Sequence, residues 1–138
     1  MTHKNPGSGT DDIVRERIAA FDSSEFARML GIAVTEAREG YARVSMPASG
    51  KKNPHDVIHG GAIFTLADHA FAIAANAGSA RRVAVSAHIQ YFAPASGDLE
   101  AVAEFVGGSG KYSVYRVTVC EGRRLVAAFD GTAIQVPP

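Results

Sequence analysis

One apolar segment constrains the fold more than any other part of the chain. It runs from about Gly60 to Ala77, is rich in alanine, and contains a single carboxylate, Asp68. Gly60 is expected to open a helix here and Gly78 to end it. Because this helix is apolar on nearly every side, other elements must cover most of its surface. An ionised carboxylate is costly to bury without a partner, so Asp68 is a candidate for chemistry.

The rest of the chain predicts two short helices and several strands. Segment 1–10 is polar and contains Gly and Pro, so we expect it to be disordered, and residues 11–138 are expected to form a single domain. Helices are expected from Asp11 or Asp12 to Phe21 and over the turns that follow Ser23-Ser24. Alternating or β-branched segments predict strands at 32–37, 41–47, 83–92, 98–106, 112–120 and 123–135. Strands that run together beside one long helix favour an α+β fold, in which a curved antiparallel sheet wraps around a long central α-helix.

Composition narrows the range of partners and compartments. The formal net charge of the 138 residues is zero, so no overall field would attract nucleic acid or an anionic membrane surface. The single cysteine, Cys120, excludes an internal disulfide and fits a reducing, cytoplasmic compartment. The first ten residues contain no apolar leader segment. The five histidines show no metal-ligand spacing, so we expect no metal site.

Two stretches of the sequence resemble a known enzyme family. The first is the motif His59-Gly60-Gly61 with Asn53 before it and Asp68 after it, and the second is the segment 87–98. Together they are similar to the hotdog-fold acyl-CoA thioesterases, in particular the branch of phenylacetic acid degradation (PaaI-type) thioesterases. The similarity covers roughly residues 30–136. One departure is Ala93, at a place where the family often has Arg.

The resemblance implies both an architecture and a reaction. It implies the hotdog fold, a sheet wrapped around a central helix, assembled as homodimers and usually as homotetramers. The substrate would be an acyl-CoA, with coenzyme A as part of the substrate and no other cofactor. Carried over position by position, Asp68 is the acidic catalyst, the backbone N–H of Gly60 stabilises the oxyanion, and Asn53 assists from the loop.

The residues themselves suggest further contacts, each with a structural alternative. His59 could orient the loop or the carbonyl, or be a hydrogen-bonded structural residue. Gly60-Gly61 could admit the ligand close to the backbone, or only form a tight turn. Arg81 and Arg82 are candidates for the phosphates of coenzyme A, although surface arginines are more often simply solvated.

Three residues share the helix face of Asp68. Thr65 and Ala72 lie one turn before and one turn after it, and Asn76 lies one turn further on. Thr65 could bind substrate or its own backbone, and Ala72 leaves space for an acyl or aryl group. Asn76 could meet a polar substrate group or form a hydrogen bond at the helix end.

Helix geometry separates the two main candidates. Eight residues of helix rise roughly 12 Å, so Gly60 and Asp68 of one chain cannot both contact one carbonyl group. Two such helices packed antiparallel about a two-fold axis would place Asp68 of one chain near Gly60 of the other. The sequence therefore predicts a composite site, two per dimer, with Asp68 acting as a nucleophile or as a general base.

Two other functions fit the same sequence. A hotdog-fold dehydratase or hydratase would need His59 to work together with Asp68 in proton transfer. A non-catalytic acyl-CoA-binding protein would bind the thioester tightly without turnover.

Overall fold

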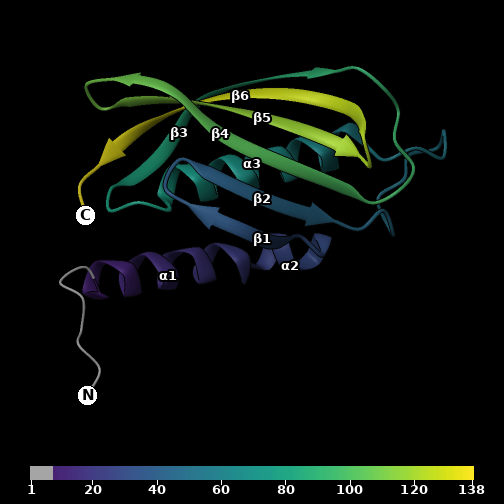
Figure 1. Cartoon of the computed structure of the whole chain (residues 1–138). Coiled ribbons are helices and arrows are strands. Elements are labelled where there is room, and N and C mark those ends of the chain that lie inside the picture. Colours follow the sequence, from purple (N-terminus) through teal and green to yellow (C-terminus); the bar gives the residue numbers. More distant parts are fainter. Residues whose placement is uncertain (1–7) are drawn as a thin grey trace.

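Helix α3 lies against a curved sheet and forms the centre of the molecule (Figure 1). The computed structural model describes residues 8–138, with side chains from residue 11 onward. Its elements are α1 (Ser8–Asp22), α2 (Glu25–Leu30), β1 (Ala33–Arg38), β2 (Tyr41–Met46), α3 (Gly60–Asn76), β3 (Arg81–Tyr91), β4 (Leu99–Ser109), β5 (Tyr112–Glu121) and β6 (Arg124–Val136). The first helix thus begins at Ser8, three residues before its predicted start. The remainder of the segment expected to be disordered, residues 1–7, lies outside the described part.

The six strands form one antiparallel sheet in the order β1-β2-β4-β5-β6-β3. The expected α+β arrangement, an antiparallel sheet around a long helix, is confirmed. The register links distant parts of the sequence, because β3 pairs along its length with β6 instead of with the next strand, β4. This pairing leaves β1 and β3 at the two edges of the sheet.

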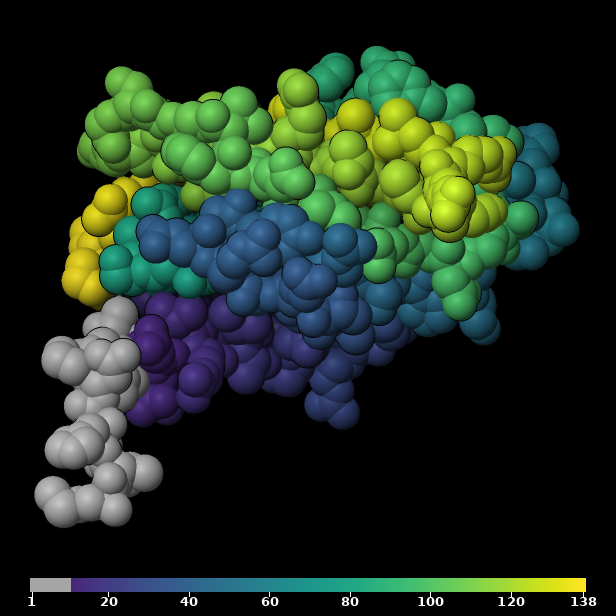
Figure 2. Space-filling view, in the orientation of Figure 1, coloured from purple at the N-terminus to yellow at the C-terminus, as the bar shows by residue number. Residues whose placement is uncertain are grey.

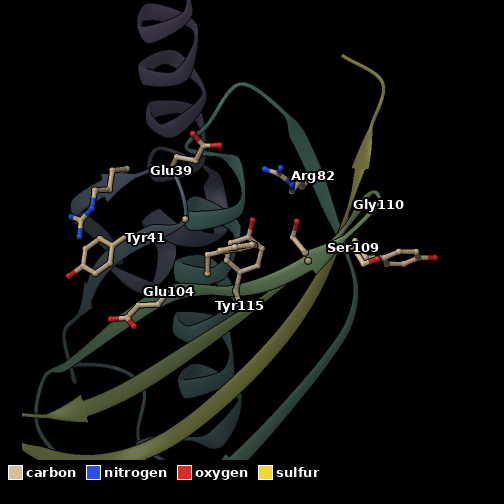
Figure 3. Close-up of a pocket in the computed structure, with 13 residues that line it drawn as sticks. Glu39, Tyr41, Arg82, Glu104, Ser109, Gly110 and Tyr115 are labelled. Atoms are coloured by element: carbon tan, nitrogen blue, oxygen red, sulfur yellow. The ribbon is translucent and has the colours of Figure 1, made fainter.

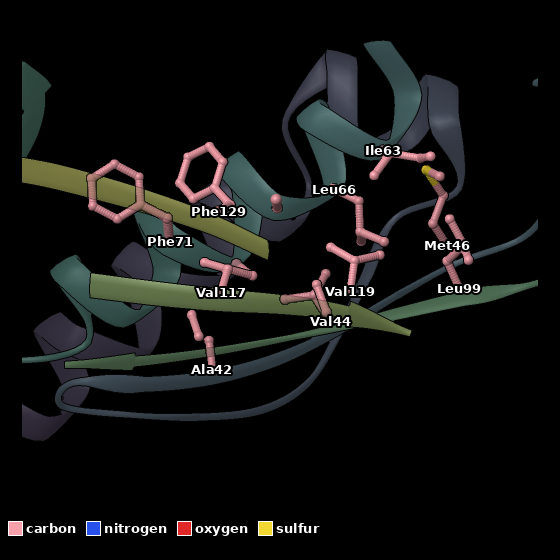
Figure 4. Close-up of a cluster of buried hydrophobic side chains, with 14 of the residues drawn as sticks. Ala42, Val44, Met46, Ile63, Leu66, Phe71, Leu99, Val117, Val119 and Phe129 are labelled. Atoms are coloured by element: carbon pink, nitrogen blue, oxygen red, sulfur yellow. The ribbon is translucent and has the colours of Figure 1, made fainter. Parts of the chain in front are cut away.

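The core fills the space between α3 and the concave face of the sheet (Figure 4). Alternate residues of β2 point inward, and Ala42, Val44 and Met46 are almost fully buried. Phe71 of α3 packs against Phe129 of β6 with ring centroids 5.8 Å apart. Small residues on α3 allow the strands to approach the helix closely, which explains its high alanine content.

Helix α1 covers part of the side of α3 that the sheet leaves open (Figures 1 and 2). Ile18 and Phe21 of α1 pack against the core cluster. Helix α1 takes this position because its own apolar residues also need burial.

The C-terminal end of α3 is held by side chains from other elements. The helix ends at Asn76, and Arg17 of α1 donates hydrogen bonds of 3.0–3.2 Å to the carbonyl oxygens of Asn76, Gly78 and Ala80. A guanidinium group at this position also favours the negative end of the helix dipole. Gly78 was expected to end the helix, which stops two residues earlier, at Asn76. A Cβ atom at Gly78 would lie 2.7 Å from the carboxylate of Glu39, an exposed side chain that can move aside.

We expect Gly131→Ala to lower the free energy of unfolding by about 1–3 kcal/mol, the usual cost of overpacking a core. A Cβ atom at Gly131 would lie 2.8 Å from the Phe71 ring, which is 2% exposed and cannot move away. Urea denaturation measures the change. Gly107→Ala is the matched control in a strand, because no atom lies within 4 Å of its Cβ position. Equal stability of the two variants would show that the Phe71 contact is not tight.

Candidate functional site

The N-terminus of α3 presents one free backbone donor. His59 caps the helix, and its Nδ1 accepts a 2.8 Å hydrogen bond from the N–H of Gly61. The Gly60 N–H makes no hydrogen bond with any described residue. An unpaired N–H at the positive end of a helix dipole suits a developing negative charge on a ligand oxygen.

The two glycines at this helix start have different reasons for being glycine. Neither adopts a positive φ, so the local chain path does not require glycine at either position. A Cβ atom at Gly61 would lie 3.0 Å from the His59 ring, so Gly61 makes room for the cap. A Cβ atom at Gly60 would make only ordinary contact, 3.4 Å from Tyr91. Packing therefore does not require glycine at Gly60, and a glycine there would let a ligand approach the backbone closely.

Tyr91, at the end of β3, was not singled out by the sequence analysis. Its hydroxyl donates a 3.0 Å hydrogen bond to the carbonyl oxygen of Gly60 and so fixes the first residue of α3. Its place inside the segment 87–98, which carries the family resemblance, was the one signal in the sequence that Tyr91 could belong to the site. A tyrosine in a strand has no distinguishing pattern of its own, so its contact with Gly60 could be recognised only from the folded structure.

The loop before α3 is organised by Asn53. Its side-chain oxygen accepts hydrogen bonds from the N–H groups of His55 (2.9 Å) and Val57 (3.4 Å), which is the pattern of an Asx turn. Its amide nitrogen donates to no described residue and remains available to a ligand.

Asp68 is half-buried and has no partner within the described chain. Burial alone raises the pKa of its carboxyl above the usual range, and no opposing cation or hydrogen bond acts on it. It lines a cavity of about 220 Å³ between α3, the start of β3 and the end of α1. The other lining residues are Phe21, Phe71, Ala72, Ala75, Asn76, Arg82, Val83, Ala84 and Ala133. A desolvated, unpaired carboxylate beside a largely apolar cavity is suited to act as a base or nucleophile.

Thr65 and Asp68 face different cavities. The Thr65 hydroxyl donates a 2.8 Å hydrogen bond to the carbonyl oxygen of Gly61. Thr65 lines a groove of about 320 Å³ together with His59 and Gly61, whose other walls include Lys51 and Lys52. Gly60 and Asp68 occupy one continuous helix, eight residues apart, and neither of these two cavities brings them together.

Asn76 and Arg82 hold the connection between α3 and β3. The Asn76 side chain exchanges hydrogen bonds with the backbone N–H and C=O of Arg82, at 2.9 and 3.1 Å. The Arg82 guanidinium donates to the carbonyl oxygen of Ala75, while its Nε is buried without a partner. Asn76 thus uses its polar atoms within the fold, whereas Arg81 is exposed on β3.

No group of three or more His, Cys, Asp or Glu residues within 8–138 could hold a metal ion. In the same range, no helix is both long and apolar enough to cross a membrane.

Comparisons with known proteins identify the family. Residues 55–128 match the family model described as the thioesterase superfamily. The chain belongs to the thioesterase superfamily. It is 32% identical over 122 residues to the acyl-coenzyme A thioesterase PaaI of Escherichia coli, covering 86% of this chain and 87% of that protein. It is 36% identical over 118 residues to a putative esterase of Deinococcus radiodurans, covering 80% and 79%.

Solved structures give the same assignment. The PaaI protein from the phenylacetic acid degradation operon of Escherichia coli aligns with a TM-score of 0.84 at 28% identity, over 93% of this chain and 96% of that one. A variant of the phenylacetic acid degradation protein PaaI from Thermus thermophilus aligns with a TM-score of 0.78 at 34% identity, over 82% and 100%. The expected hotdog fold and the expected class of enzyme, a thioester hydrolase, are thereby confirmed.

We expect Asp68→Asn to raise the free energy of unfolding at pH 7. The folded pKa of this carboxyl lies above its unfolded value of about 3.9, so the fold favours the neutral form. The stability that this preference supplies is present below the unfolded pKa and is lost as pH rises through the folded pKa. The variant should therefore exceed the wild type at neutral pH and converge with it near pH 3.5.

Urea denaturation at a series of pH values measures this difference. Asp56→Asn is the matched control, because Asp56 is exposed and its positive φ of 63° suits asparagine equally well. A variant at Asp68 that is no more stable than wild type at pH 7 would contradict the interpretation of a destabilising buried charge.

Proposed function

We propose that the protein hydrolyses acyl-CoA thioesters, releasing a free acid and coenzyme A, in a site shared by two subunits. The observation that carries this proposal is the unpaired, half-buried carboxylate of Asp68 on the helix whose first N–H is free. A relative named acyl-coenzyme A thioesterase PaaI supports the substrate class.

The free edge of β3 supports the shared site. This strand pairs only with β6, and its side chains are exposed along both faces. Val83 and Val85 are about half exposed, at 47% and 51%. A long apolar edge strand with unpaired backbone groups is a template for pairing with another strand.

A second copy added antiparallel to this edge would lay its α3 antiparallel beside the first α3. Asp68 of one subunit would then lie near Gly60 of the other. The resemblance further predicts that two such dimers form a tetramer.

The proposed chemistry divides between the two subunits. The Gly60 N–H stabilises the carbonyl oxygen as negative charge develops on it, an effect typically worth ~10²–10³ in rate. Asp68 either removes a proton from the water that attacks the thioester carbon, or attacks that carbon itself to give an anhydride that water then opens. In both courses the carbon–sulfur bond breaks, the electron pair leaves with the thiolate, and water supplies the second oxygen of the acid.

The size of the Asp68 cavity favours an aryl or medium-chain acyl group. An apolar cavity of roughly 150 Å³ is enough to hold benzene. The cavity at Asp68 is about 220 Å³ and its wall is mainly alanine, valine and phenylalanine. Ala72 lines this cavity one turn beyond the carboxylate, and its small side chain would leave space for the acyl or aryl group.

The hydratase alternative has less support. Its His59 would need a nitrogen free for proton transfer, whereas Nδ1 of His59 already accepts the hydrogen bond from the Gly61 N–H. Release of acid and thiol from a saturated acyl-CoA discriminates between the two reactions. A saturated acyl chain has no carbon–carbon double bond to which a hydratase could add water.

Asp68→Asn is expected to reduce the rate of thiol release by at least ~10², since the amide can neither accept the proton nor attack. The measurement uses a panel of aryl and saturated acyl-CoA substrates of increasing length. We expect the aryl or medium-chain substrates to give the highest kcat/KM. Asp56→Asn serves again as the exposed control. An undiminished rate in the Asp68 variant would reassign the catalyst, and tight binding without any turnover of the wild type would support a non-catalytic binding protein.

Mixing two inactive variants tests whether the site is shared. Gly60→Pro removes the N–H at the first helical position, where proline is tolerated, and the preceding residue His59 already has φ −59° and ψ 134°. Gly60→Ala is the matched control, because it adds a Cβ atom and keeps the N–H. Subunits that carry Gly60→Pro and subunits that carry Asp68→Asn should each be inactive alone. After they are unfolded and refolded together, about a quarter of wild-type activity should return, since half of the dimers would hold one intact site of two. No recovery would contradict a site that combines Asp68 of one subunit with Gly60 of the other.

A further inference from the structure

A second cavity lies at the other end of the sheet from the start of α3. Its volume is about 730 Å³, within the range of roughly 300–1,000 Å³ that small-molecule sites occupy. It lies between the β1–β2 turn, the β4–β5 hairpin and the start of β3, and the hairpin overhangs it (Figures 2 and 3). The residues that line it are Arg38, Glu39, Gly40, Tyr41, Arg82, Glu104, Phe105, Gly108, Ser109, Gly110, Tyr112, Ser113 and Tyr115.

Two hydroxyl groups in this cavity are free for a ligand. Tyr115 is only 2% exposed and Ser113 only 8%, and the hydroxyl of neither forms a hydrogen bond with a described residue. Neither oxygen is one of the fully buried polar atoms that lack a partner, so both hydroxyls open onto the cavity. Both residues lie on the inward face of β5, so the fold directs them into the cavity together.

Packing keeps the Tyr115 hydroxyl in this position. The Tyr115 ring lies between Phe71 and Phe105, with centroids 5.6 and 5.7 Å away, in edge or tilted contacts. The ring cannot rotate away without opening the core, so its hydroxyl stays at the cavity wall. Figure 3 shows Tyr115 in the wall with Arg82 and Glu39 near it.

The charges around the cavity nearly cancel. Arg38 and Arg82 are balanced by Glu39 and Glu104, and neither glutamate forms an ion pair with a described residue. Arg38 lies over the Tyr41 ring at 3.8 Å, and the Arg82 guanidinium donates to the Ala75 carbonyl oxygen, so both cations already have contacts within the fold. Four aromatic rings contribute to the wall, those of Tyr41, Phe105, Tyr112 and Tyr115. Flat apolar surface, hydrogen-bonding groups and no net charge together match an uncharged ring that carries polar substituents.

We propose that this cavity binds a small uncharged aromatic molecule with hydroxyl or amino substituents, and that Tyr115 and Ser113 form its hydrogen bonds. A phenol and a nucleoside both have this chemistry. The site is separate from the proposed thioester site, since Asp68 lines a different cavity and only Arg82 is common to both. Binding here does not depend on whether the protein hydrolyses acyl-CoA.

Titration calorimetry on the full chain tests the proposal with two probes, 4-hydroxybenzyl alcohol and adenosine. At least one should bind, and which of them binds distinguishes the phenol from the nucleoside. Tyr115→Phe should raise its Kd about threefold to tenfold, the usual effect of one lost hydrogen bond, because the ring and its packing are retained. Tyr91→Phe is the matched control, which removes a hydroxyl outside the cavity and should leave the Kd unchanged. Ser109→Trp, on the exposed hairpin, should block binding.

Two results would overturn the site. Neither probe binds, or Tyr115→Phe binds as tightly as Tyr91→Phe. Ser113→Ala provides a second hydroxyl deletion in case the Tyr115 variant does not fold. These outcomes are independent of thioesterase activity, so failure of the hydrolase proposal and failure of this one are distinguishable.

Discussion

The burial of α3 against the sheet is the constraint on which the rest of the structure depends. Its apolar surface cannot face water, so β2, β4, β5 and β6 curve around one side and α1 covers part of the other. Enclosure on this scale leaves little room for a charged group, and it is what desolvates Asp68. The same packing that stabilises the fold therefore raises the pKa of this carboxyl.

Each end of α3 is fixed by side chains, and the two ends serve different purposes. At the N-terminus, the His59 cap and the Tyr91 hydroxyl hold the first turn and leave the Gly60 N–H unpaired. At the C-terminus, Arg17 satisfies three carbonyl oxygens of the helix end and the chain that follows. A helix anchored at both ends keeps its free donor and its carboxylate at a fixed separation, which a site with demanding geometry requires.

The sequence predicted the elements well because their signals are local. The alternation of Ala42, Val44 and Met46 and the apolar run of α3 each identify one element without reference to the rest of the chain. The motif around Gly60 and Asp68 likewise lies within one short stretch. What could not be predicted depends on distant pairs.

The features that could not be predicted are contacts between residues that lie far apart in the sequence. Nothing in the sequence indicates that Arg17 meets the end of α3, that Glu39 packs on Gly78, or that Tyr115 faces a cavity. The same is true of β3, whose partner β6 lies more than thirty residues further along the chain. As the chain leaves the ribosome, β3 emerges with both edges open and stays so until β6 has been made. Closing this ladder requires a long loop, which slows folding and prolongs the exposure of an aggregation-prone strand. During synthesis, the backbone groups of β3 thus remain unpaired longer than those of the strands that pair with their neighbours in sequence.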